Sequence, residues 1–292
     1  METGALIVSA LGHACWDNVL VWMVREDPDA SIIHMHWLRM CIMCLFLYIV
    51  SWKSKRPSKS ILWWIKFSLV GWTIPGCMYT MSVIFTGYRF SFSFQPFIPL
   101  LVAFKIGAPF GERRSAALIF AMLGSMSILS DFGSYELWMI WAAILTSAVH
   151  VYSISEWFTM LNSIEKNQIG AISFGARIGV FLLFITMIVW TPEHLAATYM
   201  SNPINWILIL TASAAIAGCK YWVLAVLSRN MSGDSVAIFE CVHPIATLCS
   251  DIARGHDIFE WQDAVAIFCF ILSWILYPKT NIKSVTQLQN DK

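Results

Sequence analysis

The sequence predicts an all-α integral membrane protein of ten transmembrane helices, arranged as two inverted five-helix repeats. The first observation behind this prediction is composition, since 58% of the 292 residues are hydrophobic and only 13% are charged. Soluble domains average roughly 45–50% apolar and about 25% charged residues. The second observation is a series of ten apolar runs, and the third is an internal repeat. Composition and a net charge of only +1 exclude a disordered chain, a nucleic-acid-binding domain and an ordinary cytosolic enzyme.

The ten apolar runs each come close to the roughly 20 residues that a helix needs to cross a bilayer. Short polar breaks separate them. We expect spans at residues 4–24, 33–51, 61–85, 90–109, 115–130, 136–158, 169–190, 203–226, 234–253 and 261–278. The first run lacks a basic leader and is followed by REDPDAS, so we interpret it as a span and not as a signal peptide.

The distribution of Lys and Arg predicts the orientation of these spans. Positive residues gather in the breaks that follow even-numbered runs and in the tail 279–292, whereas the odd-numbered breaks hold only Arg25, Arg89 and Arg254. Because Lys and Arg in short loops favour the cytoplasmic side, we expect both termini to be cytoplasmic. We expect a multi-pass protein of the plasma (inner) membrane.

Residues of the third and fourth runs recur in the eighth and ninth at constant offsets. At an offset of 142, Trp64, Ile65, Ile74, Gly76, Cys77 and Tyr79 become Trp206, Ile207, Ile216, Gly218, Cys219 and Tyr221. At an offset of 145, Phe94, Gln95, Pro99 and Glu112 become Phe239, Glu240, Pro244 and Asp257. The alternative is chance matching of apolar letters. The repeat divides the chain into 1–132, 133–278 and the tail 279–292. Since five spans per half is an odd number, the halves enter from opposite sides and enclose a cavity near the midplane.

One stretch of the first half carries a family resemblance. Pro99 is followed by a hydrophobic helix and then by the run Gly111-Glu112-Arg113-Arg114-Ser115, and Arg39 lies early in the second span. This pattern resembles the EamA-type proteins of the drug/metabolite transporter superfamily. The second half repeats the proline as Pro244 but has His256-Asp257 in place of Gly-Glu. The resemblance implies a ten-helix carrier of small organic solutes.

Ionisable side chains at membrane depth are costly unless they face protein or water, which makes each a candidate functional residue. In the first span, His13 lies one helical turn from Asp17, and Asn18 follows; His150 has a comparable place in the sixth span. We interpret them as a polar cavity lining, with a hydrogen-bond network between packed helices as the alternative. Lys66, Lys105 and Glu156 lie near span ends, where charged groups reach the headgroups.

The ninth span carries Glu240 and His243 on one face just before Pro244, and the fourth offers Gln95 before Pro99. A proline removes a backbone hydrogen bond, and we expect Pro99 and Pro244 to act as hinges. We interpret Glu240 as a proton-titrating or cation-binding group. The alternative is a structural ion pair of Glu240 with one of three cations, which are Arg177, Lys220 and Arg39.

Arg39 and Arg177 occupy equivalent spans and could each hold a carboxylate or phosphate, with structural pairing as the alternative. Lys220, beside Tyr221, could contact an anionic solute. Aromatic residues fall into two expected groups. Trp63, Trp64, Trp157, Trp190 and Trp261 fit the membrane–water interfaces, and Trp16, Trp72, Tyr79 and Tyr221 lie deeper, where they could stack on a solute or serve packing.

We expect a secondary transporter that moves a small organic metabolite, such as an amino acid or S-adenosylmethionine, by alternating access. The alternatives are a channel or scaffold subunit and, less favoured, an intramembrane enzyme, because the sequence holds no GxSxG, HExxH or P-loop motif. Cys41 and Cys44 have metal-like spacing, but no second ligand pair follows, so we expect no metal and no cofactor. The expected partners are a small-molecule substrate and the lipid bilayer, with no nucleic acid and with a homodimer left open.

Overall fold

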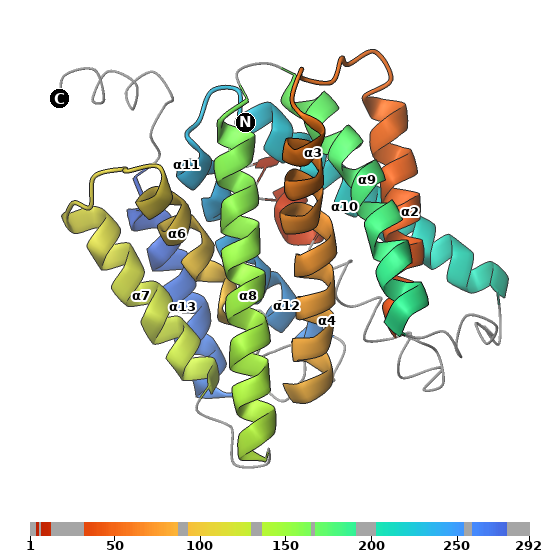
Figure 1. Cartoon of the computed structure of the whole chain (residues 1–292). Coiled ribbons are helices and arrows are strands. Elements are labelled where there is room, and N and C mark those ends of the chain that lie inside the picture. The colour runs from red at the N-terminus through yellow and green to blue at the C-terminus, as the bar shows by residue number, and fades with distance from the viewer. Residues whose placement is uncertain are drawn as a thin grey trace, which may run out of the picture.

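The structure is a computed structural model that describes residues 4–5, 7–12, 32–86, 93–129, 136–164, 167–190, 203–253 and 259–278. Within these ranges the regular elements are helices (Figure 1), which confirms the all-α class. The first half contains α2 (Ile32–Val50), α3 (Ile61–Ser68), η1 (Leu69–Thr73), α4 (Ile74–Thr86), η2 (Gln95–Phe97), α6 (Ile98–Lys105) and α7 (Glu112–Leu129). The second half contains α8 (Leu137–Asn162), α9 (Gln168–Trp190), α10 (Pro203–Leu227), α11 (Gly233–Ala237), η4 (Ile238–Cys241), α12 (Val242–Ala253) and α13 (Trp261–Leu276).

Four described helical stretches are long and apolar enough to cross a membrane by length and composition. They are Ile61–Ser82, Leu137–Asn162, Gln168–Thr186 and Leu210–Leu227. His36–Val50 and Trp261–Leu276 are apolar but shorter. Each expected range from 33 to 278 coincides with a helix or a broken helix, and in the first range residues 4–5 and 7–12 are helical. The number of ten crossings stays a prediction.

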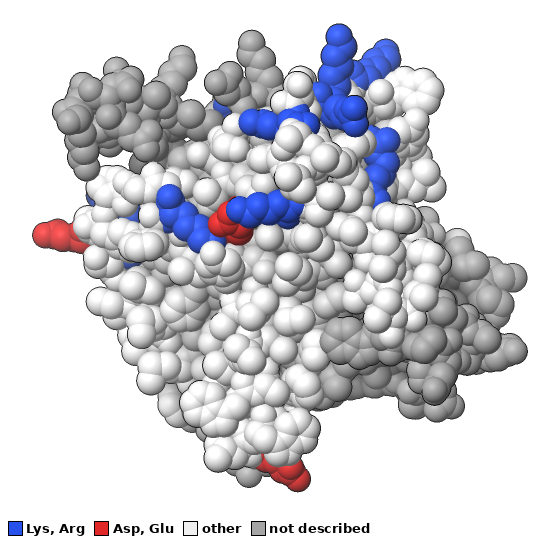
Figure 2. Space-filling view, viewed as in Figure 1, with Lys and Arg blue, Asp and Glu red and all other residues white. Residues whose placement is uncertain are grey.

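The molecular surface agrees with contact to lipid. Figure 2 shows Lys and Arg at one end of the molecule, where α3 begins, and a broad uncharged surface below them. We call this the basic end; the loop before α3 contributes Lys53, Lys55, Arg56 and Lys59 to it. Large apolar side chains stand exposed on α7, α8 and α13, among them Met126, Trp141 and Phe268. Soluble monomers rarely expose apolar surface of this kind over several neighbouring helices.

Three helical segments depart from α-helical geometry. The helix Ile61–Thr86 changes to a π-helix over η1, immediately before Pro75, whose missing N–H cannot serve the carbonyl one turn earlier. The helix that contains Pro99 begins with the 3₁₀ turn η2, and the helix that contains Pro244 is preceded by the 3₁₀ turn η4. Both prolines lie in the first turn of an α-helix, a position that tolerates the loss of the N–H.

Helices from the two halves of the chain pack against one another. α7 lies along α13, α2 packs against α9 and α10, α4 packs against α8, and α6 packs against α11. Glycines permit the close approach. A Cβ at Gly175 would lie 2.6 Å from the ring of Phe67, and a Cβ at Gly179 would lie 2.6 Å from Trp72. Small residues at helix contacts are typical of membrane proteins, because there packing drives association.

Candidate functional site

An open cavity lies between the two halves of the chain. Its empty space measures about 750 Å³, a volume that includes its open part. Its wall includes seven of the predicted site residues, which are Tyr79, Gln95, His150, Lys220, Tyr221, Glu240 and His243. These residues come from α4, η2, α8, α10, η4 and α12, and two of these six elements are the 3₁₀ turns. Irregular backbone at membrane depth is tolerated where it lines a cavity.

Lys220 and Glu240 form a buried ion pair in the cavity wall. The Lys220 Nζ atom lies 2.9 Å from Oε1 and 3.2 Å from Oε2 of Glu240, and each side chain is only 7% exposed. Of the three cations that the sequence offered to Glu240, the structure therefore brings Lys220 to it. A charge pair withdrawn from water holds together strongly, because either partner alone would be a buried, uncompensated charge.

Gln95 and His150 form a second polar contact in the wall, and their geometry defines the tautomer of the imidazole. Nδ1 of His150 lies 2.9 Å from the carbonyl oxygen of Pro75. Since a carbonyl oxygen only accepts, Nδ1 carries the proton and donates. Nε2 of a neutral ring is then an acceptor, and it lies 2.6 Å from the amide Nε2 of Gln95. The amide nitrogen of Gln95 donates to it.

Aromatic rings form much of the remaining wall. The ring of Tyr79 lies between two histidines, with its centroid 5.6 Å from that of His150 and 6.1 Å from that of His243. Tyr221 packs against Trp72 at 4.6 Å and against Trp157 at 5.9 Å between ring centroids. Tyr79 is buried and Tyr221 is half-buried, and both line the cavity.

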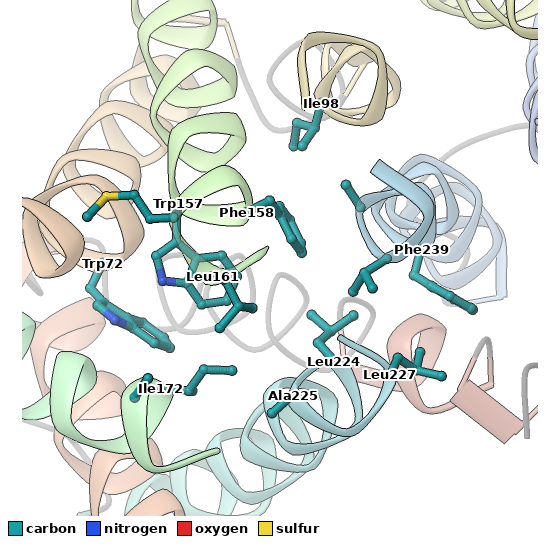
Figure 3. Close-up of a cluster of buried hydrophobic side chains, with 14 of the residues drawn as sticks. Trp72, Ile98, Trp157, Phe158, Leu161, Ile172, Leu224, Ala225, Leu227 and Phe239 are labelled. Carbon is teal, nitrogen blue, oxygen red and sulfur yellow. The ribbon is translucent and has the colours of Figure 1, made fainter. Parts of the chain in front are cut away.

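An apolar cluster borders the cavity. Trp72, Trp157 and Phe158 line the cavity and also belong to a buried apolar cluster that continues through Leu224 and Phe239 (Figure 3). α8 ends at the basic end of the molecule (Figure 1). On this helix Trp157 and Phe158 follow His150 by about two turns at 1.5 Å rise per residue. The cluster therefore lies between His150 and the basic end.

A buried polar network lies beyond this cluster, near α11. Nη2 of Arg114 lies 2.8 Å from Oδ2 of Asp234, and the two side chains are 3% and 0% exposed. The hydroxyl of Tyr277 lies 3.0 Å from the same carboxylate oxygen and 3.2 Å from the carbonyl oxygen of Pro99. Ser232 donates to the other oxygen of Asp234. We call Arg114, Asp234 and Tyr277 the latch, because they join the first half of the chain to the second.

Several predicted site residues lie elsewhere. Arg39 is fully buried and does not line the cavity; its Nη2 atom lies 3.3 Å from Nδ1 of His36, which does. Arg177 does not line the cavity, and its binding role stays a prediction. This side chain is exposed, and its guanidinium lies over the rings of Tyr48 and Phe174. Pro99 and Pro244 do not line the cavity either. His13, Asp17 and Asn18 lie outside the described residues.

Sequence reasoning missed several wall residues and misplaced another. Trp157 was expected at a membrane interface but is 1% exposed and lines the cavity, and Trp64 is buried as well. His36 and Gly71 were not singled out. The signals for these residues were weak, because a tryptophan near a span end fits an interface and a core equally well. Trp261, by contrast, is exposed as expected.

Comparison with solved structures supports the fold. No family model matches the chain, and no curated protein matches it. A crystal structure of a protein with 11% sequence identity superimposes with a TM-score of 0.69, over 94% of this chain and 96% of the other. At this identity the match shows a shared fold alone.

Proposed function

We propose that the protein is a secondary transporter that moves a small organic metabolite, such as an amino acid or S-adenosylmethionine, across a membrane by alternating access. The observation that carries the proposal is the cavity, where an ion pair, three histidines and five large aromatic residues meet inside an apolar helical body. Polar groups are expensive at such depth and mark a pathway by default. Cavities at the interface of two repeats are the usual binding sites of secondary carriers.

The internal arrangement supports an inverted repeat of ten spans and membership of the EamA-type branch of the drug/metabolite transporter superfamily. Gln95 and Glu240, which match at the offset of 145, both lie on 3₁₀ turns and both line the cavity. Tyr79 and Tyr221, which match at the offset of 142, line it too. Two pairs of helices that are expected to correspond, α2 with α9 and α7 with α13, pack against each other, as helices beside a pseudo-two-fold axis would.

Alternating access requires that the cavity close toward one side while it is open to the other. The apolar cluster and the latch are two layers of closure toward the basic end, which we assign to the cytoplasm because Lys and Arg gather there. Movement would separate α6 from α11 and break both layers. The 3₁₀ turns η2 and η4, each beside a proline, are the positions where these helices can bend.

Uptake into proteoliposomes tests the proposal. The purified chain is reconstituted, a metabolite mixture is presented outside, and the trapped contents are read by mass spectrometry against empty liposomes. We expect one class of metabolite to accumulate. Its flux should saturate, and unlabelled substrate should reduce the flux of labelled substrate by competition. Flux proportional to concentration without saturation would favour the channel alternative. Equal contents in both liposome preparations would overturn the proposal.

A further inference from the structure

We infer that Arg56 and Arg177 bind the phosphate of an anionic phospholipid in the leaflet at the basic end. This inference goes beyond transport, because it concerns the outer surface of α2 and α9 and not the cavity. Both arginines are exposed, and both guanidinium groups lie over the ring of Phe174, with Cζ 4.8 Å from its centroid for Arg56 and 5.3 Å for Arg177. In the described part of the chain, neither arginine forms an ion pair with a carboxylate.

Two separate elements bring the arginines to one ring. Arg177 lies about one turn after Phe174 on α9. Arg56 comes from the loop before α3, which approaches α9 so closely that a Cβ at Gly170 would lie 2.4 Å from the carbonyl oxygen of Lys55. The glycine permits this contact, and the contact places Arg56 over Phe174. The two positive charges are therefore held together by the fold.

The arginines lie at the depth of lipid headgroups. α9 begins at Gln168, beside the loop of the basic end, so that Arg177 lies about 13 Å along the axis at 1.5 Å rise per residue. Its side chain turns back toward the basic end, because Nε donates to the carbonyl oxygen of Ser173 at 3.3 Å. Long cationic side chains of membrane helices reach the headgroups in this way. Lys and Arg extend from the basic end over the side where α2 and α9 lie (Figures 1 and 2).

The surface beyond the arginines fits an acyl chain. The guanidinium of Arg177 lies 5.1 Å from the ring centroid of Tyr48 on α2, which packs against α9. Leu45 and Phe181 are exposed on these two helices. Since α2 ends and α9 begins at the basic end, Leu45 lies about one turn deeper than Tyr48, and Phe181 about one turn deeper than Arg177. A lipid whose phosphate contacts the arginines therefore lays its chain on apolar side chains.

Charge favours an anionic lipid over a zwitterionic one. Guanidinium groups bind phosphate through paired N–H donors, and phosphatidylcholine also carries a phosphate. Its choline, however, brings a third positive charge close to the two arginines, whereas phosphatidylglycerol brings none. Anionic lipids are characteristic of the cytoplasmic leaflet, which is the side that the proposed function assigns to the basic end.

Lipid titration of the purified full chain tests the inference. The chain in a neutral detergent is titrated with phosphatidylglycerol and with phosphatidylcholine of the same acyl chains, and bound lipid is counted by native mass spectrometry. Loss of one charge-assisted contact corresponds to about tenfold in affinity. We expect phosphatidylglycerol to bind at least about tenfold more tightly than phosphatidylcholine. Glycerol phosphate, which has the phosphate without acyl chains, should not displace the bound lipid at equal concentration.

Two variants should remove the preference for the anionic lipid. Arg177→Gln and Arg56→Gln should each lower the affinity for phosphatidylglycerol about tenfold and leave that for phosphatidylcholine unchanged. Either variant alone tests the inference, because the arginines lie on separate elements. Lys66→Gln is the matched control, since it removes one positive charge from an exposed residue near the basic end that donates to Glu156 at 2.7 Å. This variant should keep the affinity of the original chain.

Equal affinity for the two lipids would overturn the inference. So would a loss in Arg177→Gln and Arg56→Gln no larger than in Lys66→Gln, because the attraction would then depend on net charge alone. Displacement of the lipid by glycerol phosphate at equal concentration would assign the arginines to a soluble anion and overturn the lipid as their ligand. Binding is measured here without flux, so that these outcomes are independent of the uptake experiment that tests the proposed function.

Discussion

At the scale of single residues, buried hydrogen bonds fix the side chains of the cavity wall, and the loss of one of these bonds should reduce stability. The imidazole of His150 is fixed from both sides, by the carbonyl of Pro75 and by the amide of Gln95. Both contacts are buried, so that they hold the orientation of the ring in the cavity wall.

Replacement of Gln95 by Leu should therefore reduce both stability and transport. The Gln95→Leu variant leaves Nε2 of His150 without its amide donor, which costs about 1–3 kcal/mol for a buried acceptor. The matched control is Gln168→Leu, which removes the buried bond from Gln168 to the carbonyl of Ile164 outside the cavity. Denaturant unfolding should show a similar loss for the two variants, whereas proteoliposome uptake should fall only for Gln95→Leu. Equal uptake by the two variants would show that the contact between Gln95 and His150 does not contribute to transport.

Gly71 should not accept even a methyl group. A Cβ at this position would lie 2.3 Å from Cδ1 and 2.6 Å from Nε1 of Trp157, so that Gly71→Ala must displace a ring that lines the cavity. Overpacking of this kind costs about 1–3 kcal/mol, and the unfolding midpoint should fall accordingly. The control Gly111→Ala meets no atom within 4 Å and should change stability by less than about 0.5 kcal/mol. A neutral Gly71→Ala would contradict the packing described for η1.

At the scale of elements, the latch joins α7, α11 and the end of α13 through one carboxylate. Asp234 serves both Arg114 and Tyr277, and all three side chains are buried. The loss of a charged group from such a network should reduce stability strongly, and the loss of a hydroxyl should reduce it weakly, because only the loss of a charged group leaves an uncompensated charge behind.

Two variants of the latch should therefore reduce the free energy of unfolding by different amounts. Asp234→Asn leaves the guanidinium of Arg114 buried without its counter-charge and should cost about 3–5 kcal/mol. Tyr277→Phe removes one hydroxyl and should cost about 1 kcal/mol. Lys66→Met is the control, since Lys66 is 58% exposed in its pair with Glu156 and such pairs contribute about 0–1 kcal/mol. Free energies of unfolding, measured for the three variants under the same conditions, show which variant loses the most stability. An equal loss in Tyr277→Phe and Asp234→Asn would refute the charge argument.

The positions of the helices could be predicted from sequence, and their irregularities only in part. Apolar runs of sufficient length marked α8, α9 and α10 to within a few residues at most ends, because a membrane imposes both length and composition. The 3₁₀ turns beside Pro99 and Pro244 agree with the expected loosening. The π-helix at η1 was not predicted, since its cause depends on Pro75 and on the close contact of Gly71 with Trp157.

The candidate site could be predicted by residue type but not by partner. Buried charge pointed to Lys220 and Glu240, yet three cations were open to Glu240, and only the folded structure shows that Lys220 is the one that reaches it. Arg177 shows the reverse case. Its place in an apolar run suggested a role in binding solute, but the helix face on which it lies is exposed and aromatic, which no periodicity in that uniformly apolar run could reveal.

At the scale of the whole molecule, the proposed closure at the basic end would determine from which side the cavity can be reached. The apolar cluster around Trp157 and Phe158 lies between His150 and the basic end, and the latch lies beyond it. A water-soluble reagent should therefore reach the cavity from the opposite side, and the two termini should lie on the side that it cannot use, as the distribution of Lys and Arg predicts.

Thiol labelling tests this arrangement in a background in which the eight native cysteines are replaced. Ala217→Cys places a thiol in the cavity wall and Ser232→Cys places one beside the latch. A membrane-impermeant maleimide should label the first from the side opposite to epitope tags at both termini, and should leave the second unlabelled from either side. Addition of Asp234→Asn should make both positions react from the side of the tags, because loss of the latch favours opening there. Detection of the two tags on different sides of the membrane would contradict alternating access in this molecule. So would labelling of Ala217→Cys that is the same from both sides and the same with and without Asp234→Asn.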